Sequence, residues 1–201
     1  MSTRPTLILG STSRYRRELL ERLRLPFEVR APEVDETPLP GERPAALAQR
    51  LALAKAQAVS KLFPDAVVIG SDQVADLDGE SIGKPVTHAR AVAQLRAMRG
   101  RSVVFQTAVA VVRGSTGHIG TALAQVTVRF RWLSDAEIEH YLHTEQPYDC
   151  AGSAKSETLG IALLDAIESD DPTALVGLPL IRTSALLRAA GIDPLLPANP
   201  A

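Results

Sequence analysis

The sequence predicts an α/β fold with a mixed β-sheet. Strand-like and helix-like segments alternate through the first half of the chain, an order typical of α/β proteins. Two long strand-like stretches, residues 103–112 and 121–132, then follow one another, which indicates some antiparallel pairing. The chain has 201 residues, 45% of them hydrophobic, so it can bury a sizeable core.

Each element of the first half has a local signal. The strands are short apolar or alternating runs that end at turn-forming residues. The first helix places Leu19, Leu20 and Leu23 on one stripe, and the second has high helical propensity. The expected elements are, in order, a strand at 6–9, a helix at 15–24, a strand at 27–30, a proline-rich acidic loop at 31–44, a helix at 45–62 and a buried strand at 66–69.

The second half has equally local signals. In the longer of the two strand-like stretches, Val126, Val128, Phe130 and Trp132 alternate with polar residues, which indicates one buried and one wet face. Ser134 and Glu137 form a capping box. The expected elements are a hairpin turn at 78–79, a helix at 88–98, the strands at 103–112 and 121–132, a helix from 134 to about 143, a loop at 148–156, a helix at 179–190 and a loose tail at 193–201.

Composition and charge exclude several classes of function. The 22 Lys and Arg side chains nearly balance the 23 Asp and Glu, and the formal net charge is -1, whereas a phosphate-backbone binder needs a basic excess. No apolar run approaches the roughly 18 residues of a membrane span, and residues 1–9 do not have the pattern of a signal peptide. The single cysteine, Cys150, excludes an internal disulfide. We therefore expect a cytoplasmic protein without nucleic-acid or membrane partners.

The first strand and the helix after it form a candidate anion site. A strand that ends in small residues before a helix presents free backbone N–H groups at the positive end of the helix dipole. The turn carries Ser11 and Ser13 and the helix carries Arg16 and Arg17, whose side chains suit phosphate oxygens. An N-capped helix with solvated arginines is the structural alternative. The sequence does not show which arginine would contact phosphate.

Acidic residues in two places are candidate metal ligands. Glu33, Asp35 and Glu36 lie in the loop at 31–44, and Asp72 follows the buried strand at 66–69. Ligands of open α/β sheets gather at the carboxyl ends of strands, and hard cations such as Mg²⁺ or Mn²⁺ prefer oxygen ligands. The alternatives are a solvated acidic loop and, for Asp72, a turn residue at the end of its strand.

Two lysines and two histidines need separate interpretations. Lys84 precedes Pro85, which holds it in an extended segment and suits a phosphate contact. Lys55 lies in the middle of an expected helix, where a lysine is more often a solubilising side chain. His140 and His143 lie one helical turn apart without a third ligand nearby in sequence, so we expect them at the surface rather than on a metal.

Small residues gather in the segment 150–157, which also carries one lysine and one glutamate. They permit close approach of the backbone to a ligand, and a plain flexible loop is the alternative. Cys150 has no sequence context for nucleophilic chemistry, so we interpret it as a packing residue.

In combination, six short motifs resemble those of one family. They are Gly-Ser-Thr-Ser-x-x-Arg-Arg at 10–17, Ala-Pro-Glu-Val-Asp-Glu at 31–36, Leu-Ala-x-x-Lys-Ala at 51–56, Gly-Ser-Asp-Gln at 70–73, Gly-Lys-Pro at 83–85 and Gly-Leu-Pro-Leu at 177–180. Over nearly the whole chain, from Leu7 to about Leu187, the set resembles the Maf nucleoside triphosphate pyrophosphatases. Gly-Ser-Asp-Gln, Cys-Ala-Gly-Ser and Lys-Ser-Glu are most similar to the bacterial branch that hydrolyses 7-methyl-GTP.

The resemblance implies a fold and a reaction. The fold would be a single Maf-like or inosine-triphosphatase-like α/β domain over residues 1–201, with two lobes around a central cleft and a mixed twisted sheet flanked by helices. The reaction would cleave a nucleoside triphosphate between its α- and β-phosphates, with a divalent cation (Mg²⁺, Mn²⁺ or Co²⁺) as cofactor. A homodimer is also compatible with the resemblance.

The resemblance further implies three groups of site residues. The catalytic and metal-binding positions would be Asp72 (proton acceptor and metal ligand), Lys55, Lys84 and Glu36; the substrate-binding positions Ser11, Ser13, Arg16 and Arg17; and the positions that set substrate choice Tyr15, Gln73 and Glu157.

One position departs from the family's pattern. The 7-methyl-GTP branch usually carries Trp where this chain has Tyr15, whereas the dTTP/UTP branch carries Arg there, with Thr and Gln in place of Gln73 and Glu157. A tyrosine still stacks on methylated guanine, whose positive ring favours an electron-rich face. Glu157 can accept hydrogen bonds from the Watson–Crick edge of guanine. We therefore expect hydrolysis of 7-methyl-GTP to 7-methyl-GMP and pyrophosphate, which removes a modified nucleotide from the pool.

Two other functions remain open. A pyrophosphatase for UTP, dTTP or another non-standard nucleotide would use the same chemistry with a different base pocket. A nucleotide-binding regulator of cell division and septum formation would need no turnover. The presence of Asp72, Lys55 and Lys84 together favours catalysis, because binding alone needs no general base.

Overall fold

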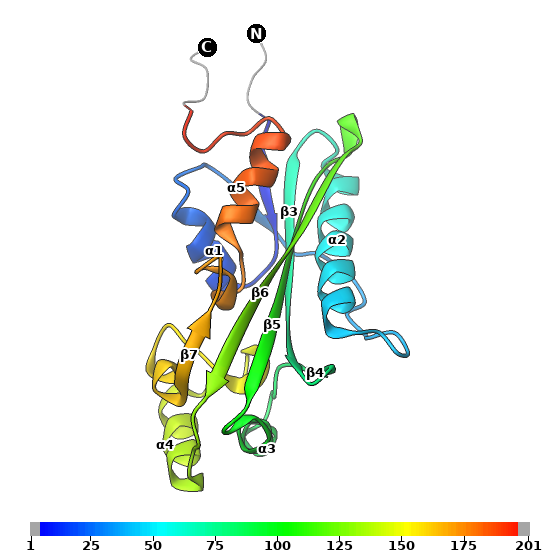
Figure 1. Ribbon diagram of the computed structural model, residues 1–201. Helices are drawn as coiled ribbons and strands as arrows, with labels where there is room; N and C mark the ends of the chain where they lie inside the picture. Colours follow the sequence, from blue (N-terminus) through cyan, green and yellow to red (C-terminus); the bar gives the residue numbers. More distant parts are fainter. Residues whose placement is uncertain (1–4, 197–201) are drawn as a thin grey trace.

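The computed structural model describes residues 5–196 of the chain and confirms the α/β class. Within this range, a sheet of seven strands is flanked by five α-helices (Figure 1). The strands are β1 (Leu7–Gly10), β2 (Glu28–Arg30), β3 (Val67–Leu77), β4 (Glu80–Ile82), β5 (Ser102–Arg113), β6 (His118–Phe130) and β7 (Leu164–Glu168). The helices are α1 (Arg14–Glu21), α2 (Pro44–Leu62), α3 (His88–Met98), α4 (Asp135–Glu145) and α5 (Leu180–Ala189).

The sheet is mixed, as the two consecutive long strands predict. Its order is β2-β1-β3-β5-β6-β7, and β4 pairs with β3 beside this path. The pairs of β1 with β2 and with β3 are parallel, and the other pairs are antiparallel. The parallel part therefore lies at the β2 and β1 edge, and the long antiparallel part forms the rest of the sheet.

Strand β3 is longer than the sequence pattern predicts. The expected strand ends at Ile69, but β3 continues to Leu77 because β5 pairs with it from Val68 to Asp76. Its parallel partner β1 stops earlier, where Gly10 pairs with Gly70. The interpretation of Gly-Ser-Asp-Gln as a turn after the strand is therefore wrong. The motif lies within β3 at the point where β1 ends.

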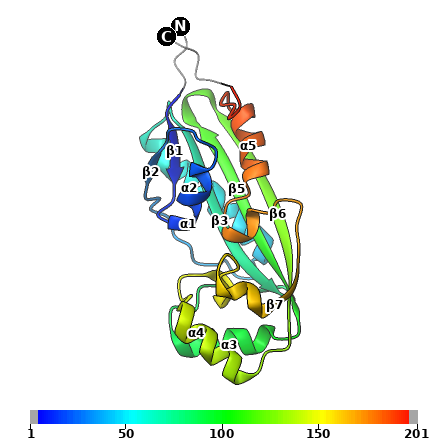
Figure 2. The ribbon, with the colours of Figure 1, turned by 90° about the vertical axis from the view of Figure 1, so that its left-hand side faces the viewer.

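Helices cover both faces of the sheet at one end of the molecule (Figures 1 and 2). On one face, Leu51 of α2 packs with Ile8 and Val68. On the other face, α1 and α5 pack against the alternate residues Leu9 and Ile69, as the period-2 geometry of a strand requires. Helices α3 and α4 lie together at the far end, where they share a third apolar cluster with β5 and β6.

Gly70 brings α2 unusually close to β3. A Cβ atom at this position would lie 2.3 Å from the carbonyl oxygen of Ala52 and 2.5 Å from the backbone nitrogen of Ala56, so only glycine fits between the helix and the strand. Lys55 lies between these two residues on α2, and Asp72 lies two residues after Gly70 on the same face of β3. The close packing therefore brings a lysine and an aspartate together.

Several local predictions are confirmed, one is wrong and one is only partly covered. Trp132, expected on the buried face of its strand, lies beyond the end of β6 at Phe130 and is 74% exposed. Helix α3 spans residues 88–98 as expected, and the capping box of Ser134 and Glu137 opens α4. The predicted tail at 193–201 is described as far as Leu196, where residues 193–196 form a turn, and residues 197–201 lie outside the described range. Among residues 5–196, no helix has the length and apolar character needed to cross a bilayer.

Candidate active site

A cavity of about 730 Å³ opens at the point where β1 ends. Its walls come from the start of α1, the loop after β2, α2, β3, the segment after β4, and the loops around residues 149–157 and 175–177. The residues nominated from the sequence that line it are Ser11, Ser13, Tyr15, Arg16, Glu36, Lys55, Asp72, Gln73, Lys84 and Glu157. Segments far apart in the sequence thus meet in one place, and Glu33, Asp35 and Arg17 do not line it.

The N-terminus of α1 forms one wall of the cavity. Ser13 caps the helix, because its Oγ accepts a hydrogen bond from the backbone N–H of Arg16 at 3.4 Å. The Oγ of Ser11 in turn accepts from the N–H of Ser13 at 3.2 Å. All residues from Ser11 to Arg16 line the cavity, so the positive end of the helix dipole faces it, which favours an anion.

The structure distinguishes Arg16 from Arg17, the two arginines of α1 nominated from the sequence. Arg16 is held on the cavity wall, where its Nε donates to the carbonyl oxygen of Gly177 at 3.0 Å and its Nη1 to Ser11 Oγ at 3.4 Å. Burial lowers the pKa of this guanidinium from its ordinary value, although nearby carboxylates oppose the shift. Arg17 instead points to solvent and pairs with Glu21 at 3.0 Å. Arg16 is therefore the guanidinium available to a ligand in the cavity.

A lysine and two carboxylates form the charged centre of the cavity. The Nζ of Lys55 lies 2.7 Å from Asp72 Oδ1 and 2.8 Å from Glu36 Oε1. Lys55 is only 5% exposed and Asp72 only 7%, so the interpretation of Lys55 as a solubilising residue is wrong. A buried charge needs a partner of opposite sign, and each of these two residues supplies that partner to the other.

Glu36 completes this group from the loop between β2 and α2. Burial raises the pKa of its carboxyl, but the hydrogen bond and charge of Lys55, with smaller effects of Lys84 and Arg16, outweigh burial and lower the pKa below its ordinary value. Glu36 is therefore ionised at neutral pH. Lys84 itself is exposed and lines the same cavity.

Strand β3 presents consecutive residues to opposite faces. Asp72 faces α2, whereas the amide nitrogen of Gln73 donates to Thr107 Oγ1 at 3.0 Å and to the carbonyl oxygens of Ala174 and Leu175 at 3.0 and 2.9 Å. With its nitrogen oriented by three acceptors, Gln73 keeps its side-chain oxygen free of partners within residues 5–196. This oxygen is a hydrogen-bond acceptor at the cavity wall.

Tyr15 and Glu157 also line the cavity. The Arg14 guanidinium donates to the hydroxyl of Tyr15 at 2.7 Å and lies 4.7 Å from the centre of its ring. Burial raises the pKa of Tyr15 to about 12, so its hydroxyl stays neutral. Glu157 is exposed and makes no hydrogen bond within the described part of the chain, so its carboxylate is available to a ligand.

Two parts of the wall have no clear signal in the residue pattern. The loop at 175–177 holds Arg16 through Gly177, although its only sequence mark is the Gly-Leu-Pro-Leu motif that begins there. Cys150, interpreted as a packing residue, lines the cavity, and its Sγ lies 3.8 Å from the hydroxyl of Tyr15. Burial raises the pKa of this thiol to about 12, so it is not a reactive thiolate.

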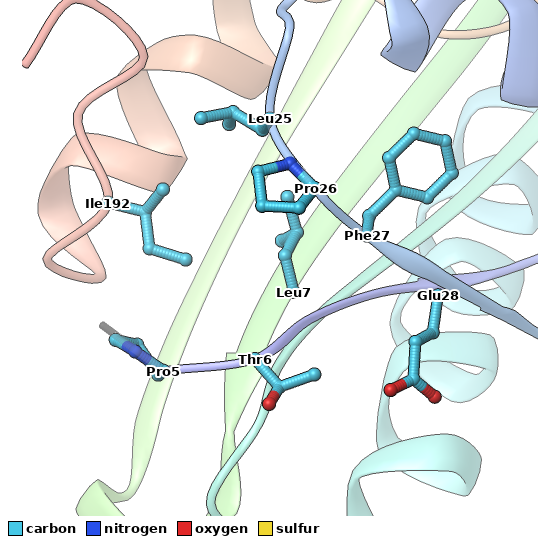
Figure 3. A pocket seen from close by; sticks show the side chains of 8 residues that line it. All are labelled: Pro5, Thr6, Leu7, Leu25, Pro26, Phe27, Glu28 and Ile192. Carbon is cyan, nitrogen blue, oxygen red and sulfur yellow. The ribbon is translucent and has the colours of Figure 1, made fainter. Parts of the chain in front are cut away.

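A second cavity, of about 370 Å³, lies near the start of β1 and does not have this chemistry (Figure 3). It is lined by Pro5, Thr6, Leu7, Leu25, Pro26, Phe27, Glu28 and Ile192. The lining is mostly apolar, and its one charged side chain is acidic, so it does not suit a phosphate. The larger cavity is the candidate active site.

Comparisons with known proteins indicate what the whole chain is similar to. A family model described as "Maf-like protein" matches residues 6–190. A 7-methyl-GTP pyrophosphatase of Polaromonas sp. (strain JS666) is 70% identical over 95% of this chain and 87% of its own length. Proteins of the same name from Albidiferax ferrireducens and Cupriavidus metallidurans are 70% and 61% identical, and the matches cover 92% and 94% of this chain and 94% and 95% of those proteins.

Proposed function

The chain belongs to the Maf family, and we propose that it is a nucleoside triphosphate pyrophosphatase that hydrolyses 7-methyl-GTP to 7-methyl-GMP and pyrophosphate. The observation that carries the proposal is the contact of the buried residues Lys55 and Asp72 with the exposed Glu36, in a cavity that also presents Arg16 and the N-terminus of α1. This combination offers a carboxylate base beside several groups that attract phosphate.

The phosphate chain binds between the cationic groups of the cavity. Arg16, Lys55 and Lys84 line it from three different elements, and the hydroxyls of Ser11 and Ser13 add polar contacts at the start of α1. A phosphoanhydride resists attack because of its own negative charge, so neutralising that charge lowers the barrier. Arg16, rather than Arg17, supplies the guanidinium, because Arg17 is paired with Glu21 at the surface.

The carboxylates suit a divalent cation. Asp72 and Glu36 both direct an oxygen toward Lys55 Nζ, and together with phosphate oxygens they form the all-oxygen donor set that Mg²⁺ and Mn²⁺ prefer. These two residues would hold the ion beside the phosphates. When bound, such a cation neutralises charge on the transferring phosphoryl group and lowers the pKa of nearby water.

Asp72 acts as the proton acceptor. A water oxygen forms a bond to phosphorus while the bond from that phosphorus to the bridging oxygen of the α–β anhydride breaks, and pyrophosphate leaves. The proton of the water goes to the carboxylate of Asp72. Lys55, 2.7 Å away, fixes the carboxylate in place and compensates its buried charge.

The base is recognised by Tyr15 and Glu157. Tyr15 supplies an aromatic surface for the positively charged methylguanine ring. Glu157, which is exposed and without a protein partner within residues 5–196, accepts from the N–H groups of the guanine edge. Uracil and thymine present two carbonyls flanking a single N–H, so a carboxylate disfavours them. A nucleotide substrate and a single free cysteine also support a cytoplasmic location.

The proposal is tested by measuring pyrophosphate release from 7-methyl-GTP, GTP, UTP, dTTP and ITP with Mg²⁺ or Mn²⁺. We expect the highest kcat/KM with 7-methyl-GTP. A preference for UTP or dTTP would be compatible with the proposed reaction but would contradict the proposed recognition of the guanine base. Tight nucleotide binding without pyrophosphate release from any of these nucleotides would contradict the pyrophosphatase activity and favour a nucleotide-binding regulator of cell division.

Glu157→Gln is expected to lower the ratio of kcat/KM for 7-methyl-GTP to that for UTP by about tenfold, because a charged acceptor opposite two N–H donors is replaced by a neutral amide. The ratio is obtained from steady-state pyrophosphate release. Asp149→Asn is the matched control, since it removes another acidic charge from the cavity wall and should leave the ratio unchanged. An unaltered ratio in Glu157→Gln would contradict the base-reading role.

A further inference from the structure

Helices α3 and α4 bring together two histidines and a glutamate outside the candidate active site. His88 is the first residue of α3, and Glu139 and His143 lie one turn apart on α4. The two helices pack side by side at the end of the molecule away from the termini (Figure 2). The sequence gives no hint of this group, because His88 is far from the other two along the chain.

The three side chains converge through their ligand atoms. The Nε2 of His88 lies 2.8 Å from Glu139 Oε2, and the Nε2 of His143 lies 3.7 Å from the same oxygen. One ligand atom from each residue lies within 4.8 Å of the other two. Neighbouring ligands of a tetrahedral zinc ion are roughly 3.3 Å apart, given bond lengths near 2.0–2.1 Å. The two contacts to Glu139 lie on either side of this value, so small rotations of these side chains suffice to enclose an ion.

A hydrogen-bonded chain behind His88 supports the ligand geometry. The Nδ1 of His88 lies 2.9 Å from the hydroxyl of Tyr148, and this hydroxyl donates to the carbonyl oxygen of Leu142 at 3.4 Å. In the structure the 2.8 Å contact of Nε2 with Glu139 is an N–H···O hydrogen bond. A metal ion would take the place of that proton, and Nδ1 would then carry the ring proton and donate it to Tyr148. Metal-bound histidines commonly have such a partner on the second ring nitrogen, which fixes the tautomer and the ring orientation.

We propose that His88, Glu139 and His143 form a second metal site, selective for Zn²⁺ or a similar transition-metal ion. Two imidazoles and one carboxylate favour such ions over Mg²⁺, which prefers oxygen ligands alone. Three protein ligands leave a fourth position for water. This site differs in ligand type from the carboxylate pair of the candidate active site.

The site connects to two segments of the active-site wall. His88 lies four residues after Lys84, and Tyr148 directly precedes Asp149 and Cys150. Lys84, Asp149 and Cys150 line the large cavity. The N–H of Val86 donates to the carbonyl oxygen of Tyr148 at 3.1 Å, which ties the two segments together. A metal ion here would link α3 to α4 and would restrain the two segments that begin or end beside it. We therefore expect the ion to raise the melting temperature of the protein.

The test is a Zn²⁺ titration of the full chain, stripped of metal and free of nucleotide, by calorimetry in an excess of Mg²⁺ that occupies the carboxylate pair. We expect one Zn²⁺ per chain and an increase in melting temperature, and Co²⁺ in its place should give a tetrahedral visible spectrum. His143→Ala and Glu139→Gln should weaken binding at least tenfold, and Tyr148→Phe about tenfold. His143 is 74% exposed as a side chain, so its replacement should not impair folding.

Two control variants distinguish this site from adventitious binding. His140→Ala removes an exposed histidine from the same helix, and Cys150→Ser removes the single thiol. Both should bind Zn²⁺ as the unmodified chain does. Absence of binding, equal affinity in His143→Ala, or loss of binding in Cys150→Ser would each overturn the proposal. None of these measurements depends on nucleotide hydrolysis, so failure here is separate from failure of the proposed function.

Discussion

Asp72→Asn is expected to lower the turnover of nucleoside triphosphate about a thousandfold, while nucleotide binding changes by less than a few-fold. An amide is nearly the same size as a carboxylate but does not accept the proton of the attacking water, and a positioned general base contributes about 10²–10⁴ in rate. Lys55 stays paired through Glu36, 2.8 Å from its Nζ, so the cavity keeps its cationic groups. Single-turnover pyrophosphate release and equilibrium nucleotide binding measure the two quantities separately.

Asp76→Asn is the matched control for this variant. Asp76 lies on the same face of β3 four residues further on and does not line the cavity. It should retain full turnover. If Asp72→Asn keeps turnover within tenfold of the unmodified chain, Asp72 is not the proton acceptor. If it loses nucleotide binding in parallel with turnover, its role is to organise the phosphate site.

Elements with local signals were predictable from the sequence. Helix α3 and the capping box of α4 depend on residues within one or two turns of each other, and those residues are visible in a single sequence. Strand β3 beyond Ile69 was not predictable, because its length is set by pairing with β5, where Gly70 pairs with Ala110 and Asp76 with Val104. Strand β7 likewise has no strong pattern and forms by pairing with β6.

The candidate site shows the same division. The start of α1 was found from its turn and its basic residues, because those features are contiguous. Lys55 was not identified from its helical position, since its burial depends on how closely Gly70 lets α2 approach β3. The resemblance to a known family identified Lys55 as a candidate catalytic residue, whereas its place in an expected helix did not. The group of His88, Glu139 and His143 had neither kind of signal and required the packing of two helices.

Lys55→Met should be the most destabilising substitution in the cavity. Methionine replaces the unbranched aliphatic part of the lysine side chain but lacks the ammonium, which leaves Asp72, only 7% exposed, without its partner. Removing one member of a buried ion pair costs about 3–5 kcal/mol, and since Glu36 is largely exposed we expect the lower end, a loss of about 3 kcal/mol. For a chain of this size that corresponds to a decrease in melting temperature of roughly 10 °C. Calorimetry measures it, with Lys61→Met, an exposed lysine on the same helix, as control.

The pH dependence of this loss has a definite sign. Lys55 lowers the pKa of Glu36 below its ordinary value of 4.5. A carboxyl with a depressed pKa in the folded state adds stability above its unfolded pKa and loses that contribution as the pH falls through the folded pKa. The difference in melting temperature between the unmodified chain and Lys55→Met should therefore be largest near neutral pH and should shrink below about pH 4.5. A difference that is constant with pH would indicate lost packing rather than lost charge.

The double variant Lys55→Met with Asp72→Asn separates stability from chemistry. Replacing both members of a buried pair removes the unpaired charge, which is the main cost of the single change, so melting temperature should recover most of its loss. Turnover should be no higher than in Asp72→Asn, because the base is not restored and the ammonium that attracts phosphate is also lost. A double variant no more stable than Lys55→Met would show that the lysine acts on the fold through packing against β3. In that case its contact with Asp72 would serve only to position the carboxylate for the proton it receives.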